Sequence, residues 1–399
     1  MNPKSQKIIV ILMGTSMLAT PSFSAEKDDD DELKTSIMLR PRVEIVDQNT
    51  ITERADAGTL LTRIALEKKL SNEFKINFEV DDVSAFIDDY NGGAGTTPDR
   101  GNFPVVADPV GTEINLATLT YKASSDTEYS IGRRRININN QRFVGGVAWR
   151  QNEQTYDSIG VSHTYSDDLA INYSYVWNIN RIFGETVNAG DHQQSTSLFE
   201  ASYSGVDNHR LSLYFFDIDN DDAAAFSTTT AGLRVEGKQE LLKYNLEFAT
   251  QSDNTNNPVD YTANYYLAEA FYPISDFTAG IGLEVLEGQS NTAGGAFRTP
   301  LSTLHKFNGW ADLFLVTPDQ GIEDTYISAK TTIEGYSATV IFHDFKSNAG
   351  SGSYGDEIDF LLTKAIDKQT GFLFKYANFS GDNGFPDRQV AWVMVTYKM

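Results

Sequence analysis

The segment that decides the fold is Phe74-Lys75-Ile76-Asn77-Phe78-Glu79-Val80-Asp81. Apolar side chains alternate with charged or polar ones, so the two sets lie on opposite faces of an extended strand. The same alternation recurs at residues 169–177, 277–285, 338–342 and 372–376. No stretch of comparable length has the spacing of an amphipathic helix. The chain is therefore predicted to be all-β.

Two kinds of connection alternate between the predicted strands. Short polar links, such as residues 71–72, 166–168 and 334–335, are interspersed with long irregular segments. The long segments are residues 81–112, 134–155, 180–196, 217–229, 287–322 and 343–355. Short turns at one end and long loops at the other are typical of bacterial outer-membrane barrels. The pattern predicts a transmembrane antiparallel β-barrel of about 18 strands, with short periplasmic turns and long extracellular loops.

A sheet of this kind must close on itself. In hydrocarbon, each unpaired N–H or C=O group at an open edge costs several kcal/mol, so the last strand is expected to pair with the first. A large secreted β-sandwich or propeller is the alternative, but it gives no reason for long and short connections to alternate. The final residue is Met399, where such barrels usually end in an aromatic residue.

The N-terminal segment predicts the cellular compartment. Lys4 and Lys7 precede an apolar run of about eleven residues and a small-residue exit, which is typical of a secretory signal peptide and too short for a membrane span of about 20 residues. We predict a signal peptide at residues 1–25, cut after Ser24 or Ala25. An acidic disordered leader follows at residues 26–33, and the outer-membrane barrel occupies residues 34–399.

Composition excludes several classes of function. The chain has 399 residues, a formal net charge of −23 and no cysteine. Its charge repels phosphate, so no nucleic acid is expected as a partner. The absence of cysteine excludes disulfides, thiolate metal sites and cysteine nucleophiles. No cofactor is predicted.

Two longer motifs go beyond the general barrel pattern. The first is Gly132-Arg133-Arg134 with residues 140–145 and 149–157, and the second is residues 305–312 with 317–318 and 321–324. Both resemble the alginate export family of outer-membrane porins, and the likeness covers most of the mature chain. The resemblance implies a monomeric barrel of eighteen strands whose arginine-rich lumen passes an acidic polysaccharide. It does not imply that alginate itself is the solute.

Basic residues are concentrated around the first of these motifs. Residues 132–152 contain five arginines and no acidic residue. If the loop after Arg134 folds into the lumen, the arginines would line its constriction, where a guanidinium pairs well with carboxylates and keeps its charge. The alternative is that they balance lumen carboxylates and stiffen the wall. The predicted pore residues here are Arg133, Arg134, Arg135, Arg142, Arg150 and the neighbouring Trp149.

Four further arginines are predicted to face the lumen from the strands. Arg40 and Arg42 lie opposite apolar residues on the first strand, Arg63 follows on the next, and Arg234 lies opposite Leu233 and Val235. Rows of charges of mixed sign can set ion selectivity. Pairing of each arginine with an acidic residue on a neighbouring strand is the alternative.

Aromatic residues are expected mainly at the two membrane interfaces. Those interpreted as lipid-facing or girdle residues are Tyr173, Tyr175, Trp177, Phe372, Phe374, Tyr376, Trp392 and Tyr397. Trp149 and Trp310 lie in long loops, where each could stack on a sugar ring or fill the loop's own small core.

Metal and enzyme hypotheses have little support. The acidic residues between Asp217 and Asp222 lack the glycine and distal glutamate of a helical calcium loop, so no metal site is predicted. The five histidines have no paired ligand spacing. His343-Asp344 resembles the residue types of outer-membrane proteases, but the chain length fits no such barrel.

The sequence predicts a porin that is not an enzyme and that passes anionic solutes or acidic oligosaccharides by passive diffusion. The alternatives are a barrel hydrolase and a structural surface barrel. The expected partners are outer-membrane lipid and lipopolysaccharide, the anionic oligo- or polysaccharide and the barrel-assembly machinery.

Overall fold

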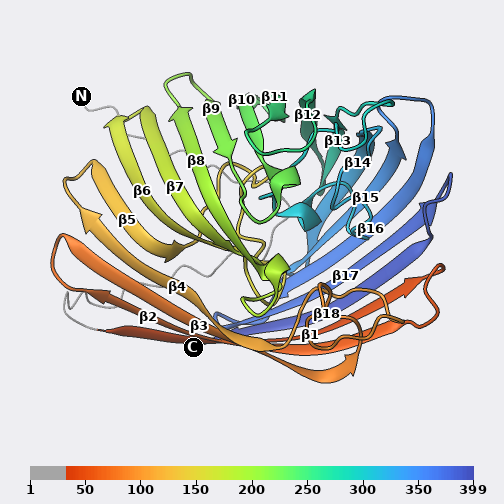
Figure 1. The fold of residues 1–399 in the computed structure, drawn as a ribbon, viewed down its shortest axis with the longest axis horizontal. Helices are drawn as coiled ribbons and strands as arrows, with labels where there is room; N and C mark the ends of the chain where they lie inside the picture. The colour runs from red at the N-terminus through yellow and green to blue at the C-terminus, as the bar shows by residue number, and fades with distance from the viewer. Residues whose placement is uncertain (1–32) are drawn as a thin grey trace.

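The computed structural model describes residues 33–399. The predicted signal peptide and residues 26–32 of the predicted leader lie outside the described residues. Eighteen antiparallel strands form one closed sheet, as the sequence predicted (Figure 1). Within residues 33–399, no helix is long and apolar enough to cross a membrane.

The strands vary in length from 8 to 16 residues. They are β1 Lys34–Gln48, β2 Ala55–Lys69, β3 Phe74–Asp89, β4 Gly111–Lys122, β5 Thr127–Arg134, β6 Thr155–Ser166, β7 Leu169–Asn180, β8 Asp191–Tyr203, β9 His209–Ile218, β10 Thr228–Gln239, β11 Leu242–Asp253, β12 Thr262–Ile274, β13 Phe277–Leu286, β14 Ile322–Ile333, β15 Tyr336–Lys346, β16 Ser353–Ala365, β17 Thr370–Gly381 and β18 Arg388–Lys398. Short 3₁₀ helices occupy Asn188–Gly190, Ala224–Phe226 and Leu304–Lys306.

Closure joins the two ends of the described chain. β1 pairs with β18 in antiparallel register, with Val43 opposite Val393. The Ile37 amide donates to the Met399 carbonyl at 2.8 Å, and the Met399 amide donates back at 2.9 Å. All the other strand pairs join consecutive strands. Figure 1 shows β1 in red beside β18 in deep blue. The sheet therefore has no free edge.

Alternation along the strands separates a lipid face from the lumen. On β7, Tyr173, Tyr175 and Trp177 are exposed on the outer surface, whereas Ser174 and Val176 between them are buried. Apolar outer faces recur around the barrel, for example at Ile131 on β5. Only half of the residues of each strand thus face lipid, which explains the low mean hydropathy of −0.34.

The long loops differ in detail from the prediction. β3 continues to Asp89, so the first long loop comprises residues 90–110 rather than 81–112. Two consecutive acidic residues, Asp81 and Asp82, suggest the end of a strand in the sequence. In the structure Asp81 lies within β3, faces the lumen and forms an ion pair with Arg63. Three shorter connections at the same end, residues 49–54, 254–261 and 382–387, were not among the predicted loops.

Three connections fold into the barrel and give it an internal core. They are residues 90–110, 135–154 and 287–321. The last of them, in cyan, lies between the walls of the sheet in Figure 1. Val106, Val144 and Trp310, one from each loop, are almost completely buried, and they belong to one apolar cluster with strand residues. The lumen is therefore a packed interior that the loops narrow, and the loop after Arg134, for which an inward fold was considered, is one of them.

One aromatic residue was assigned to the wrong face. Trp392 was expected at the lipid surface, but its side chain is 1% exposed and packs against Trp149 inside the lumen, with ring centroids 5.7 Å apart. Its neighbours Ala391 and Val393 occupy the outward positions of β18. The alternation of the strand, rather than residue type, determines which side Trp392 faces.

Candidate functional site

Strand β1 forms part of the lumen wall, and its two arginines bind the loop of residues 135–154. Arg40 donates from Nη1 to the Ala148 carbonyl at 3.0 Å, and from Nε to the Gln151 side chain at 2.9 Å. Arg42 donates to the Trp149 carbonyl at 2.6 Å and forms an ion pair with Asp108. Both arginines therefore bind loop groups, and neither guanidinium is open to the lumen.

Arg150 joins three parts of the chain. Its guanidinium forms ion pairs with Glu44 of β1 at 3.1 Å and with Asp312 of the loop at residues 287–321 at 2.9 Å. Asp312 also accepts a hydrogen bond from His305 Nδ1 at 2.8 Å. Burial alone would raise the pKa of Asp312, but His305 and Arg150 outweigh it and hold that pKa well below its usual range. These contacts fix both loops against the same wall.

Aromatic rings surround a buried lysine beside this junction. Lys375 Nζ of β17 lies 3.8 Å from the Trp310 ring centre and 4.5 Å from that of Trp149. Nζ also donates to His305 Nε2 at 2.6 Å, so Nε2 is unprotonated and the imidazole is neutral. Trp149 stacks on His305 at 4.4 Å between centroids. Trp149 therefore packs within this aromatic cluster and is 5% exposed.

A second cluster pairs arginines with carboxylates between β2, β3 and the loop after β5. Arg63 contacts Asp81 at 2.6 Å and Glu153 at 2.8 Å. Arg135 forms ion pairs with both Glu79 and Glu153. Burial would raise the pKa of Glu153, but the two arginines reverse the effect and lower that pKa. The charges of this cluster are thus largely satisfied among themselves.

The remaining predicted arginines fall into three environments. Arg133 pairs with Asp157 at 2.9 Å and with Glu185 at the rim. Arg134 donates to Ser158 at 2.8 Å and to Ser174 at 2.7 Å, with no carboxylate partner among the described residues. Ion pairs hold the last two: Arg142 with Glu284 at 2.8 Å and Arg234 with Glu247 at 2.6 Å. The structure brings these arginines to the lumen wall and rim and engages most of them in pairs.

An open cavity of about 690 Å³ lies on the short-turn side of these packed loops. Its mouth includes the β6–β7 turn at Asp167 and Asp168 and the ends of β10 and β11. Its roof consists of Asn140 and residues 306–310 of the inward loops. In outer-membrane barrels the short turns face the periplasm, so this cavity is the inner vestibule of the lumen.

Charged side chains line the cavity in equal numbers, six basic and six acidic. Most of the carboxylates already have partners. Glu236 pairs with Arg234 and Arg210, Glu269 accepts hydrogen bonds from Asn245 and Tyr326, Glu284 pairs with Arg142, and Asp324 pairs with His343. Asp167 and Asp168, in the exposed turn at the mouth, have neither an ion pair nor a side-chain hydrogen bond among the described residues, and Glu269 has hydrogen bonds but no cationic partner.

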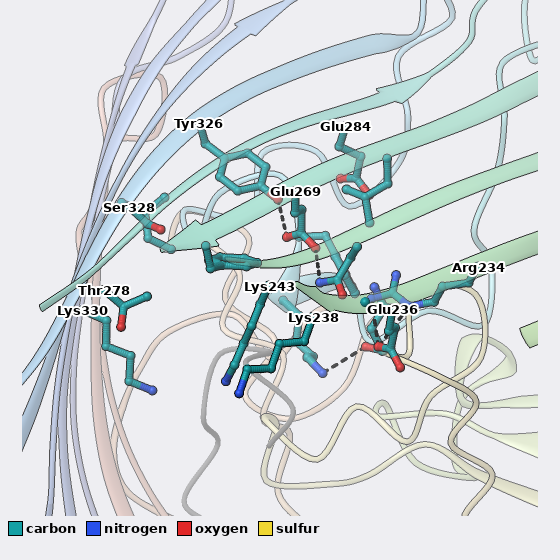
Figure 2. Close-up of a pocket in the computed structure, with 18 of the residues that line it drawn as sticks. Arg234, Glu236, Lys238, Lys243, Glu269, Thr278, Glu284, Tyr326, Ser328 and Lys330 are labelled. Carbon is teal, nitrogen blue, oxygen red and sulfur yellow. Dashed lines mark hydrogen bonds and ion pairs between the residues drawn. The ribbon is translucent and has the colours of Figure 1, made fainter. Parts of the chain in front are cut away.

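The lysines of the cavity are less engaged. Lys238, Lys243 and Lys330 form no side-chain hydrogen bond or ion pair with another residue of the described chain, and Figure 2 shows their amino groups extending into the open space. Lys306 in the roof donates to the Asn140 carbonyl at 3.0 Å. Burial, and then the nearby charge of Arg234, lower the pKa of Lys306 to about 8.

None of these four lysines was among the predicted pore residues. The sequence alternation could have placed two of them in the lumen. Lys238 shares the inward face of β10 with Arg234 and Glu236, and Lys243 shares the inward face of β11 with Asn245 and Glu247. Both lie next to a turn, where a lysine is usually a solvated surface residue. Lys306 could not be found in this way, since its position depends on how the loop folds.

The two residues considered for catalysis, His343 and Asp344, point to opposite faces of β15. His343 faces the lumen and its Nδ1 lies 2.8 Å from Asp324. Asp344 is on the opposite face of β15, where it pairs with Lys346. Adjacent residues of a strand point to opposite sides of the sheet, so His343 and Asp344 cannot act as a dyad.

Comparison with known proteins agrees with the barrel, and the family match includes the first of the two sequence motifs but not the second. The alginate export family matches residues 31–272, which is more than half of the chain. The chain belongs to the alginate export family. Membership of this family and the eighteen-stranded barrel together place the protein in the bacterial outer membrane. No curated protein is significantly similar in sequence.

The fold is similar to that of several solved structures, which include an outer-membrane protein. OccAB4 of Acinetobacter baumannii is 14% identical with a TM-score of 0.70, over 93% of this chain and 99% of its own. OpdK of Pseudomonas aeruginosa is 13% identical with a TM-score of 0.72, over 92% and 98%. OpdK has also been crystallised with vanillate, at a TM-score of 0.71 to this alginate export family member. At these identities the likeness shows the fold alone.

Proposed function

We propose that this member of the alginate export family is a passive porin for anionic solutes, with acidic oligosaccharides as its substrate class. The observation that carries the proposal is the state of the charges in the vestibule. Four of its six carboxylates are already neutralised or hydrogen-bonded, whereas Lys238, Lys243 and Lys330 have no acidic partner among the described residues. Weak attraction at several such points favours entry without trapping the solute.

In this proposal the arginines have a different role from the one that the sequence suggested. Arg42, Arg63, Arg150 and Arg234 each form an ion pair with a carboxylate, so their main effect is to fix the inward loops and the wall. The preference for anions would then come chiefly from the lysines, with Arg134 as the one arginine of the set that pairs with serines alone. The proposal thus keeps the anionic solute and changes the residues that attract it.

Overall charge does not oppose this function. The protein is strongly acidic, with a formal net charge of −23. However, the screening length at physiological ionic strength is about 8 Å, so acidic groups on the outer loops have little effect inside the vestibule. The proposal also includes a non-catalytic role, a monomeric state, and contact with lipid, lipopolysaccharide and, during insertion, the barrel-assembly machinery.

The test is the reversal potential of single channels in a planar bilayer under a KCl gradient. We expect the sign that corresponds to chloride over potassium. Lys306→Gln with Lys330→Gln should reduce the anion preference. Lys364→Gln is the matched control, because Lys364 lies at the same end of the barrel with its amino group over the outward Tyr336 ring. Cation selectivity of the unmodified channel would overturn the proposal.

A further inference from the structure

Two lysines face each other directly across one hairpin. Lys238 near the end of β10 is the register partner of Lys243 near the start of β11. Both side chains point into the vestibule, and Figure 2 shows them extending side by side in the same direction. Like charges directly opposite in an antiparallel pair, with Cβ atoms about 5 Å apart, destabilise the sheet. A counter-charge between the two ammonium groups would relieve this repulsion.

The protein does not supply that counter-charge. Glu236 shares the inward face with Lys238, but its carboxylate is held by Arg210 at 3.6 Å and by Arg234 at 3.3 Å. Asn245, the next inward residue after Lys243, donates to Glu269 at 2.8 Å. No carboxylate of the described chain lies within ion-pair distance of either lysine. The pair therefore presents an unneutralised double positive charge to the vestibule.

We infer that Lys238 and Lys243 form a carboxylate-binding site at the periplasmic mouth of the lumen. This inference rests on the proposed function and specifies where an anionic solute from the periplasm first binds. A lysine ammonium acts as a compact point charge with three donors, so two of them on one face can share the two oxygens of a single carboxylate. The site faces the lumen rather than the membrane, so its occupant is a solute and not a lipid headgroup.

The wall beside the pair fits a solute with several carboxylates. Lys330 of β14 lies on the same wall, three strands from β11, which corresponds to about 14 Å at the usual strand spacing. Phe271 of β12 is the register partner of Lys243 and lies on this path in the vestibule lining. An acidic oligosaccharide along this wall would meet two positive positions separated by an apolar ring.

The position of the site gives it a direction. A solute from the periplasm reaches Lys238 and Lys243 at the mouth, below the roof formed by residues 306–310. A solute from the extracellular side must first pass the packed loops. Binding at this site should therefore be faster from the periplasmic side than from the opposite side.

The experiment measures block of single-channel current by trigalacturonate, added to one chamber at a time, with neutral maltotriose as the comparison sugar. Ser351 lies in an exposed connection at the long-loop end. Because the chain contains no cysteine, Ser351→Cys carrying biotin reports through streptavidin which chamber holds that end.

We expect block by trigalacturonate to be stronger from the short-turn side and to weaken about tenfold, or about 1.4 kcal/mol, in the Lys238→Gln, Lys243→Gln double variant. Lys364→Gln should leave the block unchanged, and maltotriose should be insensitive to all variants. If the unmodified channel prefers anions and is blocked by trigalacturonate, but the double variant is blocked equally, this site is wrong while the proposed function stands. If the unmodified channel prefers cations, the proposed function itself fails.

Discussion

Arg150 and Asp312 form an ion pair of 2.9 Å between two loops that both fold into the barrel. Glu44 of β1 completes the junction on the other side of the guanidinium. All three groups are almost fully buried, and breaking such a pair on one side leaves an uncompensated charge. One side chain thus links both loops to each other and to the barrel wall.

The first prediction concerns this junction. Arg150→Gln should loosen the junction between the loops, because removal of one partner of a buried ion pair costs about 3–5 kcal/mol. We expect larger current fluctuations in single channels and a higher mean conductance. Arg100→Gln is the control, since Arg100 pairs with Asp88 and Asp89 at the exposed rim. Equal current noise in both variants would contradict the proposed role of Arg150.

A second prediction is a response to acid. Burial lowers the pKa of His305 to about 4, with Lys375 and Arg150 adding to this effect and Asp312 opposing it. An undocked loop would return the imidazole to its ordinary value near 6.5. The stabilisation from the neutral, docked His305 is complete above pH 6.5 and is lost as the pH falls toward 4.

At pH 5 this linkage weakens docking of the loop by roughly 2 kcal/mol. The measurement is single-channel current noise between pH 7.5 and pH 5, which should increase on acidification. His305→Asn should have a flatter pH profile, because its side chain does not titrate. An acid response of the variant equal to that of the unmodified channel would assign the effect to other groups.

The third prediction concerns the alkaline range. Because burial and Arg234 lower the pKa of Lys306 to about 8, its ammonium is charged below that pH and neutral above it. Anion preference should therefore decline as the pH rises through 8, and Lys306→Gln should lack this step. The reversal potential at pH 7 and pH 9 is the measurement. A step of unchanged size in the variant would exclude Lys306 as its source.

The fourth prediction separates a channel from a hydrolase. Asp344 pairs with Lys346 on the outward face of β15, so Asp344→Asn should leave conductance and selectivity unchanged. The purified protein should release no product from ester or peptide substrates. Hydrolysis that disappears with either Asp344→Asn or His343→Asn would instead support a catalytic barrel.

The alternation of residues was sufficient to predict the barrel. Lipid and lumen impose a period of two on every strand, so Phe74, Ile76 and Phe78 reveal their face without knowledge of their neighbours. The same reasoning placed Arg40, Arg42 and Arg234 on the lumen side. It was wrong for Trp392, where residue type was given more weight than the phase of the strand.

The partners of the arginines could not be predicted in the same way. Arg40 binds the carbonyl of Ala148, 108 residues away, and Arg150 binds Asp312 from another long loop. Such contacts depend on how irregular segments fold inside the lumen, for which no local periodicity exists. The turn lysines Lys238 and Lys243 were missed for another reason, because their significance arises from the absence of nearby acids after all other pairs have formed.

Pairing of β1 with β18 has a consequence for how the molecule assembles. Every other strand contact joins neighbours in sequence, so each closes a loop of at most 35 residues, and the entropic cost of closure grows only slowly with loop length. One contact alone spans nearly the whole described chain, from Ile37 to Met399. The slow part of folding should therefore be concentrated in a single late event, before which two unpaired edges coexist in the nascent sheet. Substitutions at the seam, such as Val43→Asp, should arrest open intermediates, whereas equivalent changes within a hairpin should mainly lower the stability of the finished barrel.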